Sequence, residues 1–371
     1  MNNKKFEVYF DYGSSKIRAA AFNKDKSINN FYYQSNYFTD HSQSKSEIEK
    51  IILNIEKNTN EYLDSINLMV DSSEAISISL SLAKNFDGSK LEKKDVQFLI
   101  QDIKQQVLKN YQNQKIIHII VKNYKIDNKD YAFLPPNIKC NLLSLDMIFI
   151  CIPKKVIENI KKLFFNLDIS IKQIFCSSYA KSTSYKNNFS ATENILFVDM
   201  GFNKTSIVSY NKNELRFFYV LPIGGNHITK DLSKVLNIDL IIAEKIKLYF
   251  DKDEGSLIEK KLSLELVQKI IFARIEEILE LCTNSIELNQ NLKQPSNFQM
   301  VLMGEGSKIL DNKFKEKIVF SKEIDLLEET TQSICESALK LCEGKNKEVV
   351  MIIPKKRINK GFFEKFFHLF K

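Results

Sequence analysis

The fold is decided by the stretch N-I-L-F-V-D-M-G at residues 194–201, an apolar run that ends in Asp-x-Gly. A second stretch with the same pattern, F-E-V-Y-F-D-Y-G, stands at residues 6–13. Each run has the length of a buried strand, and each is followed by a second apolar run that we interpret as its hairpin partner. The sequence therefore predicts two copies of one strand–turn–strand unit, which is the signature of an internal duplication.

The rest of the chain alternates helical and strand periodicity, which predicts a mixed α/β protein. We expect helices over about 46–65, 91–111, 154–166, 227–236, 239–249 and 263–289, and a last one from Ser321 or Glu328 to Leu341. We expect further strands at 75–82, 116–121, 145–152, 169–175, 214–222 and 299–303.

Composition excludes several classes of protein. With 371 residues, 44% hydrophobic and 27% charged, the chain is typical of a soluble globular protein with two or more subdomains. The six cysteines form no Cys-x-x-Cys pair, which argues for a reducing cytoplasm and against a disulfide framework or a zinc site. No apolar run reaches the length of a membrane-spanning helix, and Met1 to Lys5 do not resemble a signal peptide.

Residues 355–371, K-K-R-I-N-K-G-F-F-E-K-F-F-H-L-F-K, combine aromatic and basic side chains. At helical spacing one side carries Phe362, Phe363, Phe366, Phe367, Leu369 and Phe370. The stretch holds six Lys or Arg against one Glu, among them Lys356, Arg357, Lys360 and Lys365. We expect a helix that lies on an anionic membrane surface; the alternative is a terminal helix docked on the protein's own core.

This stretch supplies +5 of the net charge of +8, which leaves +3 for the rest of the chain. The rest shows no basic patch with interleaved aromatic residues, so the sequence does not predict nucleic-acid binding.

The two duplicated stretches end in groups that suit a phosphate and its cation. Asp11 and Asp199 are placed to hold Mg²⁺ through water, and the small residues after them let backbone N–H groups approach phosphate oxygens. Either motif alone is an ordinary turn, and the prediction depends on the pair. Glu244 and Lys247 would share one helical face and grip a ribose or purine, the alternative being a solvated salt-bridged face.

The order of these motifs resembles the FtsA family of the actin-like ATPase superfamily. The resemblance is carried by 11–17, by 198–205, by L-P-I-G-G-N-H-I-T at 221–229 with A-E-K-I-K at 243–247, and by G-E-G-S at 304–307. It implies an actin-like two-lobed ATPase fold, with duplicated RNase H-like domains, a 1C subdomain and a C-terminal amphipathic helix.

The resemblance also implies a site for ATP and Mg²⁺. Its expected residues are Asp11, Gly13, Ser14, Ser15, Lys16, Asp199, Gly201, Asn203, Thr205, Gly225, Glu244, Lys247, Gly304, Gly306 and Ser307. One departure stands out: the family's Asp-x-Gly-Gly-Gly-Thr-Thr motif here has Phe202, Asn203 and Lys204 in place of the last two glycines and the first threonine. We therefore expect ATP hydrolysis to be slow or absent.

By the same resemblance the chain divides into named parts. They are subdomain 1A (1–84 and 154–192), 1C (85–153), 2A (193–226 and 291–342), 2B (227–290), a linker (343–354) and the membrane-targeting helix (355–371).

The implied function is that of a cell division adaptor on the cytoplasmic face of the inner membrane, at the septum. Its implied partners are further copies of itself, the C-terminal peptide of FtsZ bound by 2B, other division proteins and anionic lipids. Two alternatives stay open: a pilus-assembly adaptor of the PilM type and a small-molecule kinase of the same superfamily.

Overall fold

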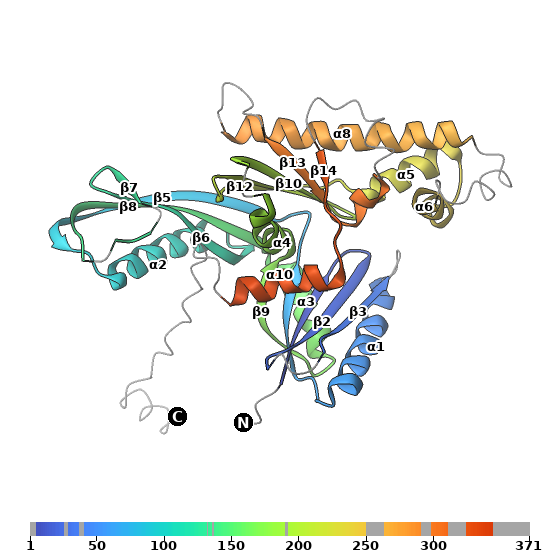
Figure 1. Ribbon diagram of the computed structural model, residues 1–371, viewed down its shortest axis with the longest axis horizontal. Helices are drawn as coiled ribbons and strands as arrows, with labels where there is room; N and C mark the ends of the chain where they lie inside the picture. Colours follow the sequence, from blue (N-terminus) through green and yellow to red (C-terminus); the bar gives the residue numbers. More distant parts are fainter. Residues whose placement is uncertain are drawn as a thin grey trace, which may run out of the picture.

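The computed structural model describes residues 5–25, 29–36, 41–131, 133–135, 137–189, 192–249, 263–290, 298–310 and 324–343. The predicted helix at 355–371, and the linker apart from Glu343, lie outside these residues. The described chain forms two lobes with a β-sheet arm on one side and a group of three helices on the other (Figure 1). Among the described residues, no helix is long and apolar enough to cross a membrane.

The first lobe is built on a five-stranded sheet of order β3-β2-β1-β4-β9. Its strands are β1 (Phe6–Tyr12), β2 (Lys16–Asn23), β3 (Phe31–Asn36), β4 (Ser65–Val70) and β9 (Ser170–Cys176). β1, β2 and β3 are antiparallel neighbours, whereas β4 and β9 continue the sheet in parallel. Its helices are α1 (His41–Thr59), α3 (Lys154–Phe165) and α4 (Ser177–Tyr185).

The second lobe repeats this topology, which confirms the predicted duplication. Its sheet has the order β12-β11-β10-β13-β14, with three antiparallel strands followed by two parallel ones. The strands are β10 (Asn194–Met200), β11 (Thr205–Asn211), β12 (Glu214–Leu221), β13 (Gln299–Met303) and β14 (Ile324–Leu326). Two 3₁₀-helices, η1 (Lys186–Phe189) and η2 (Glu305–Ile309), complete the body.

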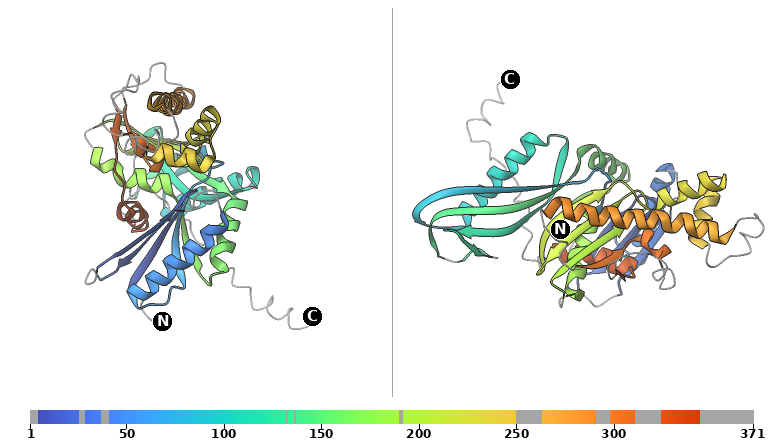
Figure 2. Two further views of the ribbon diagram at one scale, coloured as in Figure 1. Left: turned by 90° about the vertical axis from the view of Figure 1, so that its right-hand side faces the viewer. Right: turned by 90° about the horizontal axis from the view of Figure 1, so that it is seen from above.

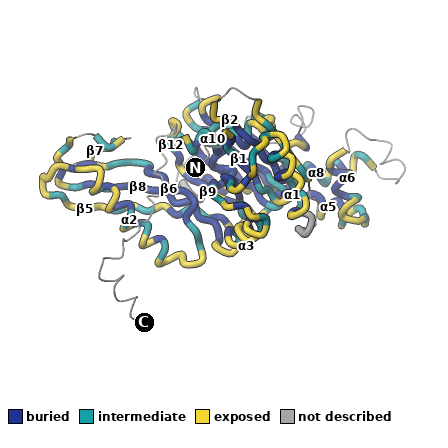
Figure 3. Tube along the Cα trace, turned by 90° about the horizontal axis from the view of Figure 1, so that it is seen from below, coloured by how far each residue is buried: buried dark blue, intermediate teal, exposed yellow. Residues whose placement is uncertain are grey.

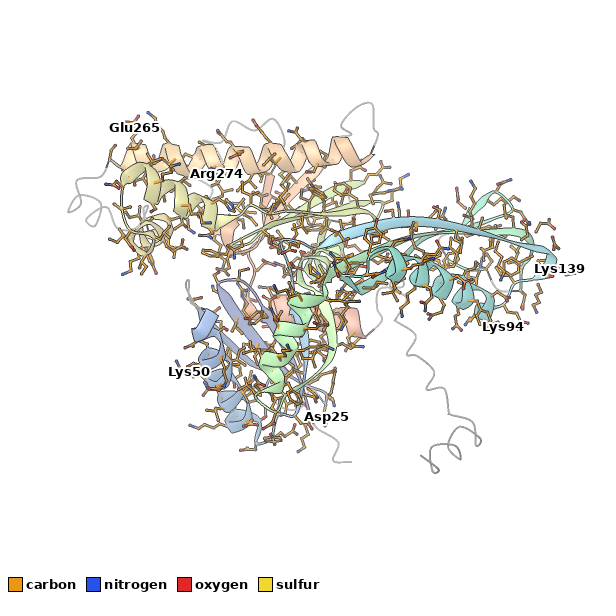
Figure 4. All side chains as sticks on the ribbon, turned by 180° about the vertical axis from the view of Figure 1, so that it is seen from behind. Asp25, Lys50, Lys94, Lys139, Glu265 and Arg274 are labelled. Atoms are coloured by element: carbon orange, nitrogen blue, oxygen red, sulfur yellow. The ribbon has the colours of Figure 1, made fainter. Side chains whose placement is uncertain are left out.

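The arm is a four-stranded sheet of order β5-β8-β6-β7 covered by α2 (Lys93–Asn110). Its strands are β5 (Ile76–Lys90), β6 (Gln114–Ile126), β7 (Lys129–Tyr131) and β8 (Lys139–Pro153). Lys94 and Lys139 lie near its far end (Figure 4). The sheet corresponds to the predicted 1C range, but β5 begins nine residues before the proposed limit at residue 85 and crosses it.

The helices opposite the arm are α5 (Gly225–Leu236), α6 (Leu240–Tyr249) and α8 (Leu264–Gln290). The guanidinium of Arg274 on α8 reaches the carboxylate of Asp231 on α5, with 2.6 Å between Nε and Oδ2 (Figure 4). This pair joins α5 to α8 in the range proposed as 2B.

Apolar packing joins the two lobes. One cluster of buried side chains includes Tyr9 and Phe10 of the first sheet together with Phe197 and Tyr210 of the second. Burial of one such side chain stabilises the folded state by about 1.5–3 kcal/mol. The arm projects from one side of the two lobes when the molecule is seen from above (Figure 2). The buried segments run through both lobes, whereas the far end of the arm is largely exposed (Figure 3). The sheets therefore sit on a shared core.

Two predicted helices have bounds that differ from the structure. The helix predicted over 46–65 ends at Thr59, and Asn60 follows it in the left-handed region at φ 53°, where a helix stops. A helix start at Ser321 is wrong, because Ile324–Leu326 form the edge strand β14. The last helix, α10 (Thr331–Cys342), begins where the Thr330 hydroxyl accepts the Ser333 N–H at 3.1 Å.

The position of α10 also differs from the proposed division. The range 291–342 placed this helix in the second lobe, whereas α10 contacts β1, β2, β3 and α4 of the first (Figure 1). Its buried face includes Ile334, Ala338 and Leu341, which belong to the shared apolar cluster. The chain therefore returns to the first lobe through α10, next to the cleft between the lobes.

Candidate functional site in the cleft between the lobes

The two duplicated hairpin turns line one cleft between the lobes. In the first turn the Gly13 N–H donates to the Lys16 carbonyl at 3.0 Å, and in the second the Gly201 N–H donates to the Lys204 carbonyl at 2.8 Å. The predicted residues that line the cleft are Asp11, Gly13, Ser14, Ser15, Lys16, Asp199, Gly201 and Gly304. The structure therefore brings the two Asp-x-Gly motifs together, as their pairing predicted.

Two glycines permit the close approach of the loops in the second lobe. Gly304 has φ 92°, and a Cβ there would overlap the carboxylate of Asp199 and lie 2.5 Å from the Met200 carbonyl oxygen. A Cβ on Gly224 would lie 2.5 Å from the Gly201 carbonyl oxygen. Both positions require glycine because backbone atoms fill the space that a side chain would need.

Among the described residues, four ion pairs cross the cleft between the lobes. Lys16 and Arg18 of the first lobe both reach Glu305 of the second, and the Lys16 Nζ–Oε2 distance is 2.9 Å. The ammonium of Lys181, on the buried helix α4, lies 2.9 Å from Asp199 Oδ1. The cleft is therefore filled by the protein's own cations and carboxylates.

The fourth pair comes from the residue that replaces the family's threonine. The Lys204 ammonium lies 2.8 Å from Asp71 Oδ2 in the first lobe and donates to the Ser206 hydroxyl at 2.6 Å. Phe202 also lines the cleft, and its ring centroid lies 5.5 Å from the Lys247 ammonium. Two of the three residues that replace the motif, Phe202 and Lys204, thus lie at the site.

The two carboxylates predicted to hold Mg²⁺ are already engaged. Asp11 accepts the Arg18 guanidinium on one oxygen at 3.0 Å and the Ser177 hydroxyl on the other at 2.8 Å. Asp199 accepts Lys181 on Oδ1. Mg²⁺ usually keeps several waters and binds through one or two carboxylates, and here three of the four carboxylate oxygens already have protein cations or donors.

Burial and charge oppose each other at these groups. Burial acts to lower the pKa of Lys181, but Asp199 and Glu329 outweigh burial and raise it. Burial acts to raise the pKa of Asp199, but Lys181 and Lys204 hold it below its ordinary value. Near Arg18, Lys308 and Lys16, the pKa of Glu305 falls to about 2 despite partial burial. Lys181, Asp199 and Glu305 are therefore ionised at neutral pH.

Glu244 and Lys247 do not line this cleft. Both side chains are buried, and the Lys247 ammonium donates to Glu244 Oε2 at 2.6 Å, to the Thr229 hydroxyl at 2.9 Å and to the Gly225 carbonyl at 3.1 Å. The pair is buried, so it is not the solvated salt-bridged face that the sequence left open as the alternative. It is a buried pair that ties α6 to the start of α5, and binding by these residues stays a prediction.

The remaining predicted site residues do not line the cleft, and each contacts a neighbouring segment of the chain. Thr205 is buried and donates to the Ile223 carbonyl at 2.7 Å, and the Ser307 hydroxyl donates to the Gly304 carbonyl at 2.7 Å. The Asn203 side chain accepts from Asn226 at 3.0 Å. The Gly225 N–H donates to the Gly201 carbonyl at 3.0 Å, and Gly306 packs against Met200.

The described cleft does not fit Mg²⁺-ATP in this arrangement. Its cavity is about 80 Å³, whereas sites for small ligands are commonly about 300–1,000 Å³. A nucleotide would also have to displace the ion pairs of Arg18, Lys181 and Lys204. A larger cavity of about 360 Å³ lies elsewhere, between β6, β9, α3 and the end of α10, and no predicted nucleotide residue lines it.

Sequence reasoning missed several residues of this network, namely Arg18, Asp71, Ser177, Lys181, Glu305 and Glu329. One signal was present: Arg18 stands between Ile17 and Ala19 in an otherwise apolar strand. Lys181 gave none, because α4 is buried on nearly all sides and so lacks the one-sided apolar pattern that identifies a surface helix.

Comparisons with known proteins agree with this fold. The family model for "Cell division protein FtsA" matches residues 196–305. The FtsA of Neisseria meningitidis is 27% identical over 207 residues, which covers 52% of this chain and 50% of that protein. The chain thus matches about half the length of this curated relative.

Two solved structures share the architecture. The PilM–PilN complex of type IV pilus biogenesis matches with a TM-score of 0.62 and 10% identity, covering 89% of this chain and 94% of that one. The ethanolamine utilization protein EutJ of Carboxydothermus hydrogenoformans matches with a TM-score of 0.51 and 10% identity, covering 90% and 88%. These structures show the fold alone. The chain is therefore similar in sequence to the cell division protein FtsA over part of its length, and it shares the fold of these two structures.

Proposed function

We propose that the chain is an actin-like cell division adaptor that associates with itself and attaches the FtsZ ring to the cytoplasmic face of the inner membrane at the septum. The observation that carries this proposal is the FtsA match over 196–305, which runs from β10 through α5, α6 and α8 to the start of η2. It covers the second copy of the duplicated unit and the three helices beside it. The arm and the two-lobed body provide the frame for head-to-tail contacts between copies.

Membrane attachment is assigned to 355–371 on the strength of its sequence. The aromatic side provides apolar area for the acyl boundary, and the lysines and arginine provide attraction to anionic headgroups. One such helix binds weakly, and self-association would present many copies at once, which strengthens attachment by avidity.

Full-length protein should co-sediment with vesicles of anionic phospholipid, and deletion of 355–371 should abolish this. Phe366→Asp with Phe370→Asp should abolish it too, because two carboxylates would enter the apolar boundary. A matched control, Gly361→Asp with His368→Asp, adds two carboxylates on the side of the helix opposite the phenylalanines and should retain most binding. Sedimentation that survives the deletion would show that another surface holds the membrane.

For the FtsZ peptide, the three helices opposite the arm present an apolar surface. Its exposed side chains are Val235, Leu240, Ile241, Leu248, Tyr249 and Leu266. Ile241 and Leu248 are seven residues apart, so they lie on the same side of α6, and each is about half exposed. Exposed apolar side chains on neighbouring helices support an interaction surface here.

Ile241→Asp with Leu248→Asp should weaken binding of a fluorescent FtsZ C-terminal peptide about tenfold or more, as expected when interface anchors worth about 2 kcal/mol are lost. The control Leu53→Asp with Phe98→Asp changes two equally exposed apolar side chains on α1 and α2. Fluorescence anisotropy titration measures both. Equal affinity for the two variants would move the peptide site away from α6.

ATP and Mg²⁺ stay predictions from the resemblance, and the ion pairs in the cleft lead us to expect weak binding and slow or absent hydrolysis. The kinase alternative would need a carboxylate free to act as a general base. In the described cleft Asp11, Asp71, Asp199 and Glu305 are each paired with a lysine or arginine. The PilM-type alternative shares the fold, but the basic aromatic stretch at 355–371 favours the membrane adaptor.

A further inference from the structure

We propose that Arg18, Lys181 and Lys204 replace Mg²⁺-nucleotide in this chain: their side chains neutralise the carboxylates of the cleft and hold the two lobes closed without a ligand. The inference rests on the actin-like body of the proposed function and not on membrane attachment or FtsZ binding. The resemblance implies a site for Mg²⁺-nucleotide in the cleft, but lysine and arginine side chains of the chain itself occupy that position.

The first argument is position. Lys181 approaches Asp199, and Arg18 approaches Asp11, and these are the two carboxylates that the duplicated motifs direct at a bound cation. Lys181 Nζ also lies 3.2 Å from Glu329 Oε2, so one ammonium contacts carboxylates from two segments. A cation fixed by the chain therefore stands where a metal ion would have to bind.

The second argument is charge. The cleft contains four cations, Lys16, Arg18, Lys181 and Lys204. Its carboxylates are Asp11, Asp71, Asp199, Glu305 and Glu329. Each of these carboxylates lies within ion-pair distance of one of the four cations. Mg²⁺-ATP would therefore have to break pairs that the chain already makes.

The third argument is that the pairs connect the lobes. Lys16 and Arg18 on β2 reach Glu305 on η2, and Lys204 before β11 reaches Asp71 after β4. Arg18, Lys181 and Lys204 are all at most 8% exposed. Opening the cleft would separate these buried charges from their partners, and an unpaired buried charge is strongly unfavourable. The side chains thus provide closure that a ligand would otherwise supply.

Titration of the full-length protein with Mg²⁺-ATP and with Mg²⁺-ADP tests the first consequence. A ligand present at 100 times its Kd would raise the Tm by roughly 5 °C or more. We expect a rise below about 1 °C at 1 mM nucleotide, and no saturable heat in calorimetry. A Tm rise of several degrees, or binding with a micromolar Kd, would overturn the inference.

Variants test whether the pairs hold the lobes together. Lys181→Met removes the cation shared by Asp199 and Glu329, and Glu305→Gln removes the carboxylate shared by Lys16 and Arg18. We expect both to increase the radius of gyration in small-angle X-ray scattering and to lower the Tm by about 6 °C or more. Glu305 is partly exposed, so its variant should fold even if Lys181→Met does not.

The matched control is Glu336→Gln, which breaks the exposed pair with Lys340 on α10, 3.3 Å apart, and should change neither quantity. An unchanged radius of gyration in Glu305→Gln would show that the ion pairs do not keep the lobes closed. Vesicle co-sedimentation should be retained in Glu305→Gln, because residues 355–371 are intact. Failure of the inference can thus be told apart from failure of the proposed function.

Discussion

Replacing Lys247 with alanine should lower the free energy of unfolding by about 3–5 kcal/mol, because the carboxylate of Glu244 would stay buried without a cation. Lys247 is 4% exposed and Glu244 is 9% exposed. The same ammonium donates to the Thr229 hydroxyl and to the Gly225 carbonyl, so the substitution also removes a donor from the start of α5. Urea unfolding followed by circular dichroism measures the change.

Two controls distinguish the cost of leaving the Glu244 carboxylate buried without a cation from the smaller cost of losing an ion pair. Lys269→Ala breaks the exposed pair with Glu265 on α8, 2.7 Å apart, and should change the free energy of unfolding by less than about 1 kcal/mol. Glu244→Leu with Lys247→Met removes both charges and should restore most of the lost stability. If Lys247→Ala and Lys269→Ala had equal effects, the pair in α6 would be solvated, contrary to its burial.

Gly304→Ala should lower the free energy of unfolding by about 3 kcal/mol or more. Part of this comes from the left-handed backbone at φ 92°, which strains a residue with a side chain by about 1–3 kcal/mol. The rest comes from overlap of the new Cβ with the Asp199 carboxylate and the Met200 carbonyl, which would push β10 away from η2. The same urea experiment measures it.

Gly88→Ala is the matched control for strain alone. Gly88 has φ 76°, but a Cβ there would lie 3.8 Å from its nearest neighbour, the Asn141 side-chain oxygen. We expect this control to lose only the strain component, about 1–3 kcal/mol. Equal losses in the two variants would show that the close approach at Gly304 is relieved by small shifts and does not shape the cleft.

The duplicated unit could be predicted because its evidence is local. A buried strand needs a continuous apolar run, and the Asp-x-Gly turns after residues 10 and 198 mark where each run ends. Helices with one apolar side, such as α2 and α3, were found for the same reason. α4 was not found, since burial on nearly all sides removes the periodicity that separates an inner from an outer face.

The candidate site was predictable only in part. The turns at Gly13 and Gly201 meet because the two hairpins belong to equivalent places in the duplicated sheets. What fills the space between them depends on residues distant in sequence: Asp71 follows β4, Lys181 lies on α4 and Glu329 precedes α10. The motifs alone give no information on which side chains meet across the cleft.

The sequence by itself determined the duplication, the mixed α/β class, the resemblance to the FtsA family and the basic aromatic stretch at 355–371. Each of these features can be read from residues that are close together in the sequence, because the spacing of apolar and polar side chains there already indicates a helix or a strand. Only the tertiary structure decided that α10 packs on the first lobe and that Lys181 and Lys204 face carboxylates of the opposite lobe. Those outcomes depend on charges and apolar faces brought together from distant parts of the chain, and their energies arise only when the lobes are packed against each other.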